Sequence, residues 1–183
     1  TGSGKSTTLA AMIHHINTTR AVHIVSIEDP VEFLHTDDQA RITQREVGSD
    51  TGSFLTALNF VVRESPDVIV IGAIRDFETM SAAMGAALAG HLVLATLDTV
   101  DATQTLQRVL SDCPEHSRQQ CAMNLAMCLE GVVSQRLLPR ADGSGRLLVC
   151  EVLVRTPAVR QLVQNQQFED LGDVMKGSSA DGM

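Results

Sequence analysis

The fold of this chain is decided by its first seven residues, Thr1-Gly2-Ser3-Gly4-Lys5-Ser6-Thr7. Glycines let a backbone turn tightly, so that successive N–H groups can point at phosphate oxygens. An apolar helical pattern follows to about Asn17, and the positive end of a helix dipole favours an anion. In loops of the G-x-x-x-x-G-K-[ST] type, the lysine reaches the β- and γ-phosphates and the hydroxyl beside it meets Mg²⁺. The stretch therefore predicts a nucleotide site that includes Lys5 and Ser6.

The loop motif is incomplete at its start. Its first glycine would lie two residues before Thr1, and the strand that leads into such a loop has no counterpart in the sequence. We therefore expect a piece of a longer protein whose first core strand lies outside this chain. The alternative interpretation is a Gly/Ser-rich tail ahead of an ordinary helix, but Gly-Lys-Ser-Thr running directly into a helical pattern favours the loop.

Composition narrows the possible functions. The chain has 183 residues, of which 44% are hydrophobic, and this is typical of a globular protein with a real core. Its net charge of −8 argues against a broad nucleic-acid surface, because such a surface needs a basic face. No apolar run is long enough to predict a membrane span. The four cysteines lack the spacing of a zinc site, so we expect reduced thiols in a cytoplasmic core.

Apolar strands alternate with helical patterns over the first hundred residues. The strands are predicted at residues 22–27, 41–46, 68–71 and 92–96, with helices between them. Such alternation indicates an α/β protein with a mostly parallel sheet that is flanked by helices. Beyond Thr99 the chain is mainly helical, apart from a predicted hairpin of residues 132–138 and 145–153. We therefore divide the chain into a nucleotide-binding core, residues 1–140, and a C-terminal part, residues 141–183, made of the hairpin end and a truncated helical segment.

An acidic cluster follows the first predicted strand. Ligand sites in parallel sheets lie beyond the carboxyl ends of the strands, and Glu28, Asp29 and Glu32 come directly after residues 22–27. A carboxylate would also be expected after the apolar run 68–71, but Gly72 and Ala73 stand there. The acidic cluster is therefore predicted to serve the metal and the attacking water, although a solvated loop is the alternative interpretation.

Several stretches resemble the motifs of bacterial type II/type IV secretion ATPases, in the same order along the chain. The phosphate loop at residues 1–13 is joined by counterparts of the family's Asp box, Q-R-E-V-G segment, Walker B segment and His box. In this sequence they read Ile27-Glu28-Asp29-Pro30-Val31-Glu32-Phe33, Gln44-Arg45-Glu46-Val47-Gly48, residues 66–76, and Gly90-His91-Leu92-Val93-Leu94-Ala95-Thr96-Leu97-Asp98-Thr99. The segments at residues 133–139 and 157–162 resemble the pilus-retraction branch of that family.

The resemblance implies a RecA-like P-loop core in a homo- or hetero-hexameric ring, with a preceding domain outside this chain. The ring would work on the cytoplasmic side of the inner membrane, beside a pilus platform protein, and would couple ATP hydrolysis to pilus retraction and twitching motility. The implied cofactors are ATP and Mg²⁺. By the same resemblance, Thr1, Gly2, Ser3, Gly4, Lys5, Ser6 and Thr7 hold the nucleotide, Ser6 and Glu28 hold the metal, and Glu28, Asp29, Glu32 and His91 are catalytic.

Two residues depart from the family pattern. Ala73 stands where the Walker B glutamate is usual, and Asp98 replaces the second histidine of the His box. Loss of a positioned base typically costs on the order of 10²–10⁴-fold in rate. Three hypotheses follow: a working retraction ATPase, a non-hydrolysing nucleotide-binding subunit in a ring with an active paralogue, or an engineered or sequencing change at Ala73. The acidic charge and the retraction-type segment at 157–162 disfavour a fourth, a DNA-transport ATPase.

Overall fold

The computed structural model describes residues 2–177 and Met183 as two compact units. One unit is Lys5–Leu97, and the other joins residues 2–4 to the described part of Asp98–Met183. The boundary that we predicted after residue 140 lies inside the second unit. The physical reason is that the strands on either side of it pair with each other along their whole length. Residues 178–182 of the predicted C-terminal part lie outside the described residues.

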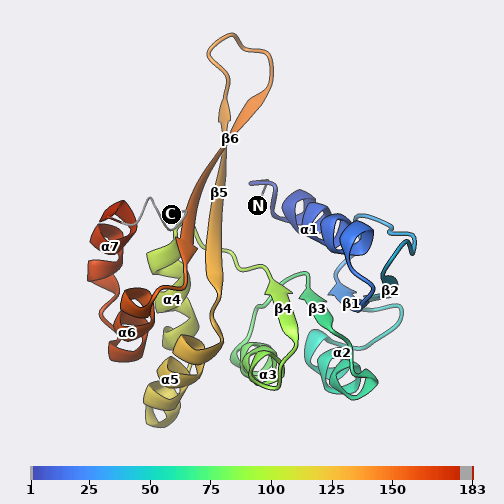
Figure 1. Ribbon diagram of the computed structural model, residues 1–183, viewed down its shortest axis with the longest axis horizontal. Helices are drawn as coiled ribbons and strands as arrows, with labels where there is room; N and C mark the ends of the chain where they lie inside the picture. Colours follow the sequence, from blue (N-terminus) through green and yellow to red (C-terminus); the bar gives the residue numbers. More distant parts are fainter. Residues whose placement is uncertain (1, 178–182) are drawn as a thin grey trace. The chain divides into compact units, whose positions relative to one another are not determined.

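The unit Lys5–Leu97 is an α/β layer structure, as the sequence predicted (Figure 1). Its four strands are all parallel and run in the order β2-β1-β3-β4. Each predicted strand is found within a residue or so of its expected position. The elements are α1 (Lys5–Thr19), β1 (His23–Glu28), β2 (Arg41–Glu46), α2 (Phe54–Val61), a 3₁₀ turn (Val62–Glu64), β3 (Val68–Ile71), α3 (Phe77–Leu88) and β4 (Leu92–Ala95).

Alternate residues of the strands feed two separate apolar layers. On one face, Ile24 and Val70 pack with Leu9 and Ile13 of α1. The odd-numbered neighbours along the same strands pack on the opposite face with α2 and α3. Figure 1 shows α1 on one side of the sheet and α2 and α3 on the other. Because both faces are covered, the central strands read as continuous apolar runs, which is typical of parallel sheets.

Short polar side chains set where the helices of this layer begin. Ser53 Oγ accepts a hydrogen bond from the Thr56 amide at 3.1 Å, and Asp76 Oδ1 accepts one from the Thr79 amide at 2.7 Å. Both are N-caps, which satisfy amides that have no partner inside the helix. The Asp76 cap starts α3 directly after the carboxyl end of β3, and it thereby fixes the length of the loop at that edge.

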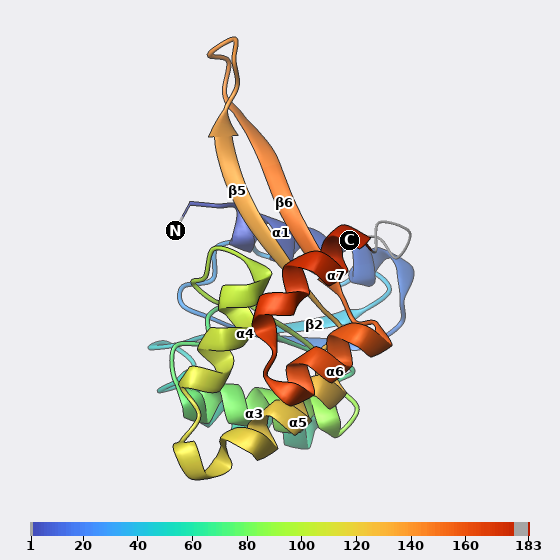
Figure 2. The same cartoon turned by 90° about the vertical axis from the view of Figure 1, so that its left-hand side faces the viewer.

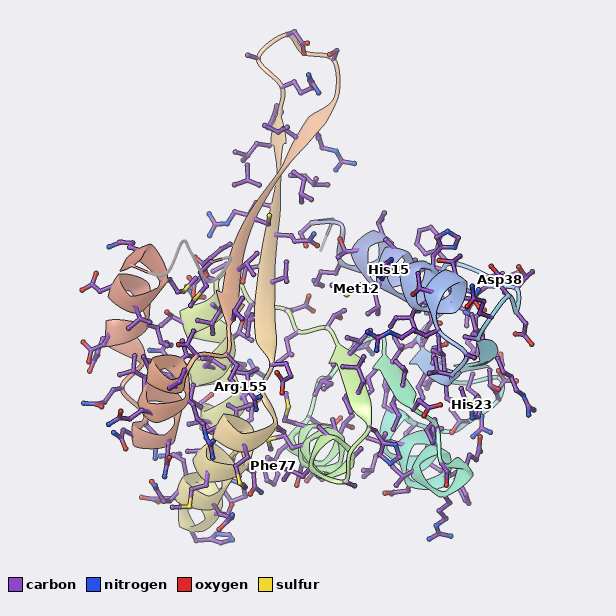
Figure 3. The ribbon with its side chains drawn as sticks, viewed as in Figure 1. Met12, His15, His23, Asp38, Phe77 and Arg155 are labelled. Carbon is purple, nitrogen blue, oxygen red and sulfur yellow. The ribbon has the colours of Figure 1, made fainter. Side chains whose placement is uncertain are left out.

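The second unit combines a long hairpin with helices (Figure 2). Its two strands pair antiparallel from Gly131↔Val154 to Pro139↔Arg146. Arg155, labelled in Figure 3, lies at the base of the hairpin, where its Nη1 is 3.2 Å from Glu130 Oε1. The elements are α4 (Ala102–Ser111), a 3₁₀ turn (Glu115–Ser117), α5 (Arg118–Cys128), β5 (Gly131–Pro139), β6 (Arg146–Val154), α6 (Pro157–Asn165), a 3₁₀ turn (Phe168–Asp170) and α7 (Leu171–Gly177).

Candidate functional site

The start of α1 has the backbone that a phosphate loop requires. Gly2 and Gly4 adopt φ values of 78° and 91°, in the left-handed region that glycine occupies without strain. Lys5 begins the helix, and Ser6 and Thr7 continue its first turn. Thr1, which we also predicted to bind the nucleotide, lies outside the described residues. The local geometry therefore suits the predicted anion site at residues 2–7.

A side-chain contact joins the first turn of α1 to the acidic loop after β1. Ser6 Oγ donates a hydrogen bond to Glu32 Oε1 at 2.9 Å, across 26 positions of sequence. The two residues come from separate predicted motifs, the phosphate loop and the Asp box. The structure thus brings together a hydroxyl and a carboxylate that we predicted to lie on the metal side of one site.

The contact lies in a cleft between α1 and the acidic loop. The cleft is lined by Ser6, Leu9, Ala10, Ile13, Glu28, Asp29, Pro30, Glu32, Phe33, His35 and Gly72. All three predicted acidic residues are among them. Burial lowers the pKa of His35 from its ordinary value, Glu28 opposes this shift and His14 adds to it. A neutral imidazole therefore lies beside the carboxylates at neutral pH.

Glu28 is held by two neighbours on the sheet. Its Oε1 accepts hydrogen bonds from Ser26 Oγ at 2.7 Å and from Gln44 Nε2 at 3.1 Å. Neither Ser26 nor the side chain of Gln44 was predicted to contact this site. Ser26 was detectable in principle, because residues two apart on a strand share a face. Gln44 was not, because its nearness to Glu28 depends on the register between two strands.

Asp29 occupies a more exposed position at the mouth of the cleft. Its Oδ2 lies 3.1 Å from Nη1 of Arg75, and the side chains are 37% and 64% exposed respectively. An ion pair between such exposed groups contributes little to stability, on the order of 0–1 kcal/mol. Its structural effect is to link the loop after β1 to the loop after β3 at the same edge of the sheet.

The carboxyl end of β3 lies close to β1 at Gly72. The Gly72 amide donates to the Ile27 carbonyl at 2.8 Å, and a Cβ there would lie 3.2 Å from Glu28 Cα. The next residue, Ala73, is half-buried and packs against the apolar layer under α2 and α3. The acidic groups of this cleft therefore come from the end of β1 and from the loop after it.

His91 does not join these residues. It precedes β4, and its Nδ1 lies 2.6 Å from the carbonyl oxygen of Pro66, which precedes β3. Both residues are at the amino ends of parallel strands, whereas Ser6, Glu28 and Glu32 meet at the carboxyl edge. The role near the γ-phosphate that we expected for His91 does not fit this position, because its ring nitrogen holds two strand ends together.

The donor set of the cleft suits magnesium bound together with a nucleotide. Mg²⁺ prefers oxygen ligands, and it is usually held by one or two protein groups plus phosphates and waters. Ser6 and the acidic loop offer a hydroxyl and carboxylates. Within residues 2–177 and at Met183, no group of three or more His, Cys, Asp or Glu side chains is placed to hold a metal by itself. Over the same residues, no helix has both the length and the apolar character to cross a membrane.

Comparisons with known proteins identify the family of the chain. The model of the type II/IV secretion system protein family matches residues 1–144. The whole chain is 44% identical to a twitching motility protein of Neisseria gonorrhoeae and 45% identical to the type IV pilus ATPase PilU of Pseudomonas aeruginosa, covering 49% and 48% of them. It is 40% identical to the type IV pilus retraction ATPase PilT of Pseudomonas aeruginosa, and covers 53% of that protein.

Solved structures show the same fold. A crystal structure of the pilus retraction motor PilT with bound ADP superposes with a TM-score of 0.92 at 43% identity, over 96% of this chain and 51% of that one. The ATPase DotB of Legionella pneumophila superposes with a TM-score of 0.87 at 28% identity, over 97% of this chain and 49% of that one. The chain thus spans about half the length of the proteins that it matches.

Proposed function

Because the chain belongs to the type II/IV secretion system protein family, we propose that it is the RecA-like nucleotide-binding part of a type IV pilus retraction ATPase. Its substrate would be ATP, with Mg²⁺ as cofactor. The relatives at 40–45% identity over the whole chain carry names from pilus retraction and twitching motility. Their similarity extends through the C-terminal helices, beyond the part that the family model matches.

One observation carries the proposal most directly, the contact between Ser6 Oγ and Glu32 Oε1. It places an acidic loop beside the residue that would meet Mg²⁺ in a phosphate loop. In the proposed site, residues 2–7 hold the phosphates, with Lys5 as the cation. Ser6 and Glu28 hold the metal, which would neutralise the charge of the phosphate oxygens when bound.

The carboxylates would divide the remaining work. Glu28 is half-buried and held at Oε1, so it is the group best fixed to orient a water. Glu32 is exposed and already pairs with Ser6, so it is placed to accept a hydrogen bond from metal-bound water. Asp29 pairs with Arg75 and would hold the rim of the site.

The assembly and location are proposed from the family alone. We expect a homo- or hetero-hexamer on the cytoplasmic side of the inner membrane, in contact with a pilus platform protein. The net charge of −8 disfavours a broad nucleic-acid surface.

An alternative function is a nucleotide-binding subunit that does not hydrolyse ATP. Two residues favour it. Ala73 places a methyl group after Gly72 at the end of β3, and a methyl group can neither take nor orient a proton. Asp98 replaces the second histidine of the His box with an anion. Such a subunit would act as a structural or regulatory partner of an active paralogue.

Phosphate release by the full-length protein separates the two functions. The wild type is compared with the double variant Ala73→Glu/Asp98→His, and Lys5→Ala is the control that should lose ATP binding. A gain of about 100-fold in the double variant, within the range that a positioned base supplies, would favour the non-hydrolysing subunit. Equal turnover in both proteins would favour the working ATPase. Retained ATP binding in Lys5→Ala would remove the phosphate-loop assignment altogether.

A further inference from the structure

We propose that Gln44 and Glu46 are positioning residues, which clamp the acidic loop so that Glu28 and Glu32 face the magnesium side of a bound nucleotide. The proposal rests on the proposed function, and it assigns work to an edge strand that the nucleotide would not touch. Here the acidic loop means residues 29–35, between β1 and β2. The clamp is the set of side-chain hydrogen bonds that β2 makes to this loop and to Glu28.

The register of the sheet creates the clamp. β1 and β2 run parallel, with Ser26 opposite Gln44 and Glu28 opposite Glu46. Residues two apart on a strand point to the same face. These four side chains therefore share the face that α1 covers, because Ile24 and Ile42 of the same alternation pack there with α1. On this face, the apolar residues Ile24 and Ile42 are followed, toward the carboxyl edge, by the two polar pairs of β1 and β2.

The Gln44 amide uses both of its ends on this region. Nε2 donates to Glu28 Oε1 at 3.1 Å and to the Phe33 carbonyl at 2.9 Å, and Oε1 accepts from the His35 amide at 2.9 Å. A primary amide has two N–H donors and one carbonyl oxygen, so all of its groups have partners. The reversed amide would place its oxygen against a carboxylate and a carbonyl, so the orientation is fixed.

Glu46 holds the beginning of the same loop. Its Oε2 accepts a hydrogen bond from the Val31 amide at 2.9 Å, and Ser49 Oγ donates to Oε1 at 3.2 Å. Together the two β2 side chains bond to backbone groups of Val31, Phe33 and His35, which are every second residue of the loop. The intervening Glu32 is the one that reaches Ser6. β2 therefore holds the backbone on both sides of Glu32, the residue that contacts the first turn of α1.

The clamp restrains a loop that has little apolar burial of its own. Phe33 and Leu34 are exposed by 40% and 89%, so apolar burial does little to fix the loop. Side-chain to backbone hydrogen bonds supply the missing restraint at three points. Outer partners of this kind orient the groups that bind a metal, and their loss typically costs about 10–100-fold in metal affinity.

The test measures how much Mg²⁺ strengthens ATP binding by the full-length protein. Dissociation constants for ATP are determined calorimetrically with excess Mg²⁺ and with EDTA, and their ratio is the readout. Gln44→Ala should reduce this ratio by about tenfold and leave binding in EDTA within about twofold of wild type. The matched control is Gln39→Ala, because Gln39 donates to the Thr18 carbonyl at 2.9 Å and does not line the cleft.

Measuring Gln44→Ala both in the wild type and in a Glu28→Gln/Glu32→Gln background separates positioning from general destabilisation. If Gln44 acts through the acidic residues, Gln44→Ala should have little further effect on the ratio when Glu28 and Glu32 are already Gln, because coupled residues are not additive. Equal effects in both backgrounds would overturn the proposal, as would a Gln44→Ala ratio equal to that of Gln39→Ala. If Gln44→Ala fails to fold, Gln44→Glu keeps the shape and the acceptor for His35 but loses the donor, and the same reduction is expected.

Hydrogen exchange tests the clamp in the absence of nucleotide, so its result does not depend on the proposed function. In the protein without nucleotide, Gln44→Ala should speed exchange of the His35 amide about tenfold or more, because that amide loses its acceptor. Gln39→Ala should leave the rate unchanged, and an unchanged rate in Gln44→Ala would overturn the clamp. Wild-type protein that binds no ATP under any condition would instead refute the proposed function.

Discussion

The two edges of the parallel sheet differ in how they use polar side chains. At the amino edge, His91 bonds to the Pro66 carbonyl and Asp67 Oδ2 accepts from the His23 amide at 2.8 Å. Both contacts join a side chain to a backbone group of another strand end. At the carboxyl edge, Gln44 and Glu46 also bond to backbone groups, but there Ser6 pairs with Glu32 and Ser26 pairs with Glu28, side chain to side chain.

The difference separates groups that hold the fold from groups that can serve a ligand. A side chain that satisfies a strand-end backbone group cannot leave without exposing that group, which costs about 1–3 kcal/mol. A hydroxyl that pairs with an exposed carboxylate can exchange it for a metal or a phosphate at little cost. The presence of a polar residue next to an apolar strand is therefore a poor guide to function. Whether the residue lies at the amino end or the carboxyl end of that strand is a better guide.

Among substitutions that test the difference between the two edges, we expect Gly72→Ala to have the largest effect on stability and on ATP binding. Gly72→Ala places a methyl group about 3.2 Å from Glu28 Cα, against backbone that has little room to move. We expect a loss of about 1–3 kcal/mol in the free energy of unfolding, and a weaker Mg²⁺ effect on ATP binding. Urea unfolding and calorimetry measure the two. Gly85→Ala is the matched control, because its Cβ meets nothing within 4 Å and the change should stabilise α3 by roughly 0.5–1 kcal/mol.

A smaller effect, on stability alone, is expected at His91. His91→Ala should lower the free energy of unfolding by about 1 kcal/mol, because the Pro66 carbonyl loses its donor. ATP affinity with Mg²⁺ should stay within about twofold of wild type, since an energy change at a distant site adds independently. His91→Asn restores a donor near the same place and should recover part of the loss. A large fall in ATP affinity with unchanged stability would break the contrast between the edges.

The smallest effect concerns the pH dependence of stability through His35. Burial lowers its pKa below the ordinary value of 6.5, so the unfolded chain binds the proton more readily than the folded chain. The stability that His35 contributes is therefore present above pH 6.5 and is lost as the pH falls through the lower folded pKa. His35→Gln should flatten the change in Tm over this acidic window. The exposed His116→Gln should leave the change as in wild type, and identical slopes in all three proteins would contradict the assignment.

The sequence by itself determined the architecture of the sheet and half of the site. Continuous apolar runs such as Val68–Ile71 identified the buried strands, and the glycine turn before Lys5 predicted an anion site. The cluster Glu28, Asp29 and Glu32 could be placed at the carboxyl edge because strand direction follows from chain order in a parallel sheet. These features are local, so they can be read one stretch at a time.

Only the tertiary structure decided which of these residues meet and which role His91 has. The Gln44 side chain reaches Glu28 because Gln44 lies opposite Ser26, and a shift of one residue would turn it to the other face. His91 follows Gly90 in a familiar pattern, yet it lies at the amino end of β4, at the edge of the sheet opposite the cleft, and its ring bonds to the Pro66 carbonyl. The units divide after Leu97, whereas the predicted division after residue 140 cuts a hairpin whose two strands pair along their whole length. Register is a property of contacts between distant residues, and no single stretch contains it.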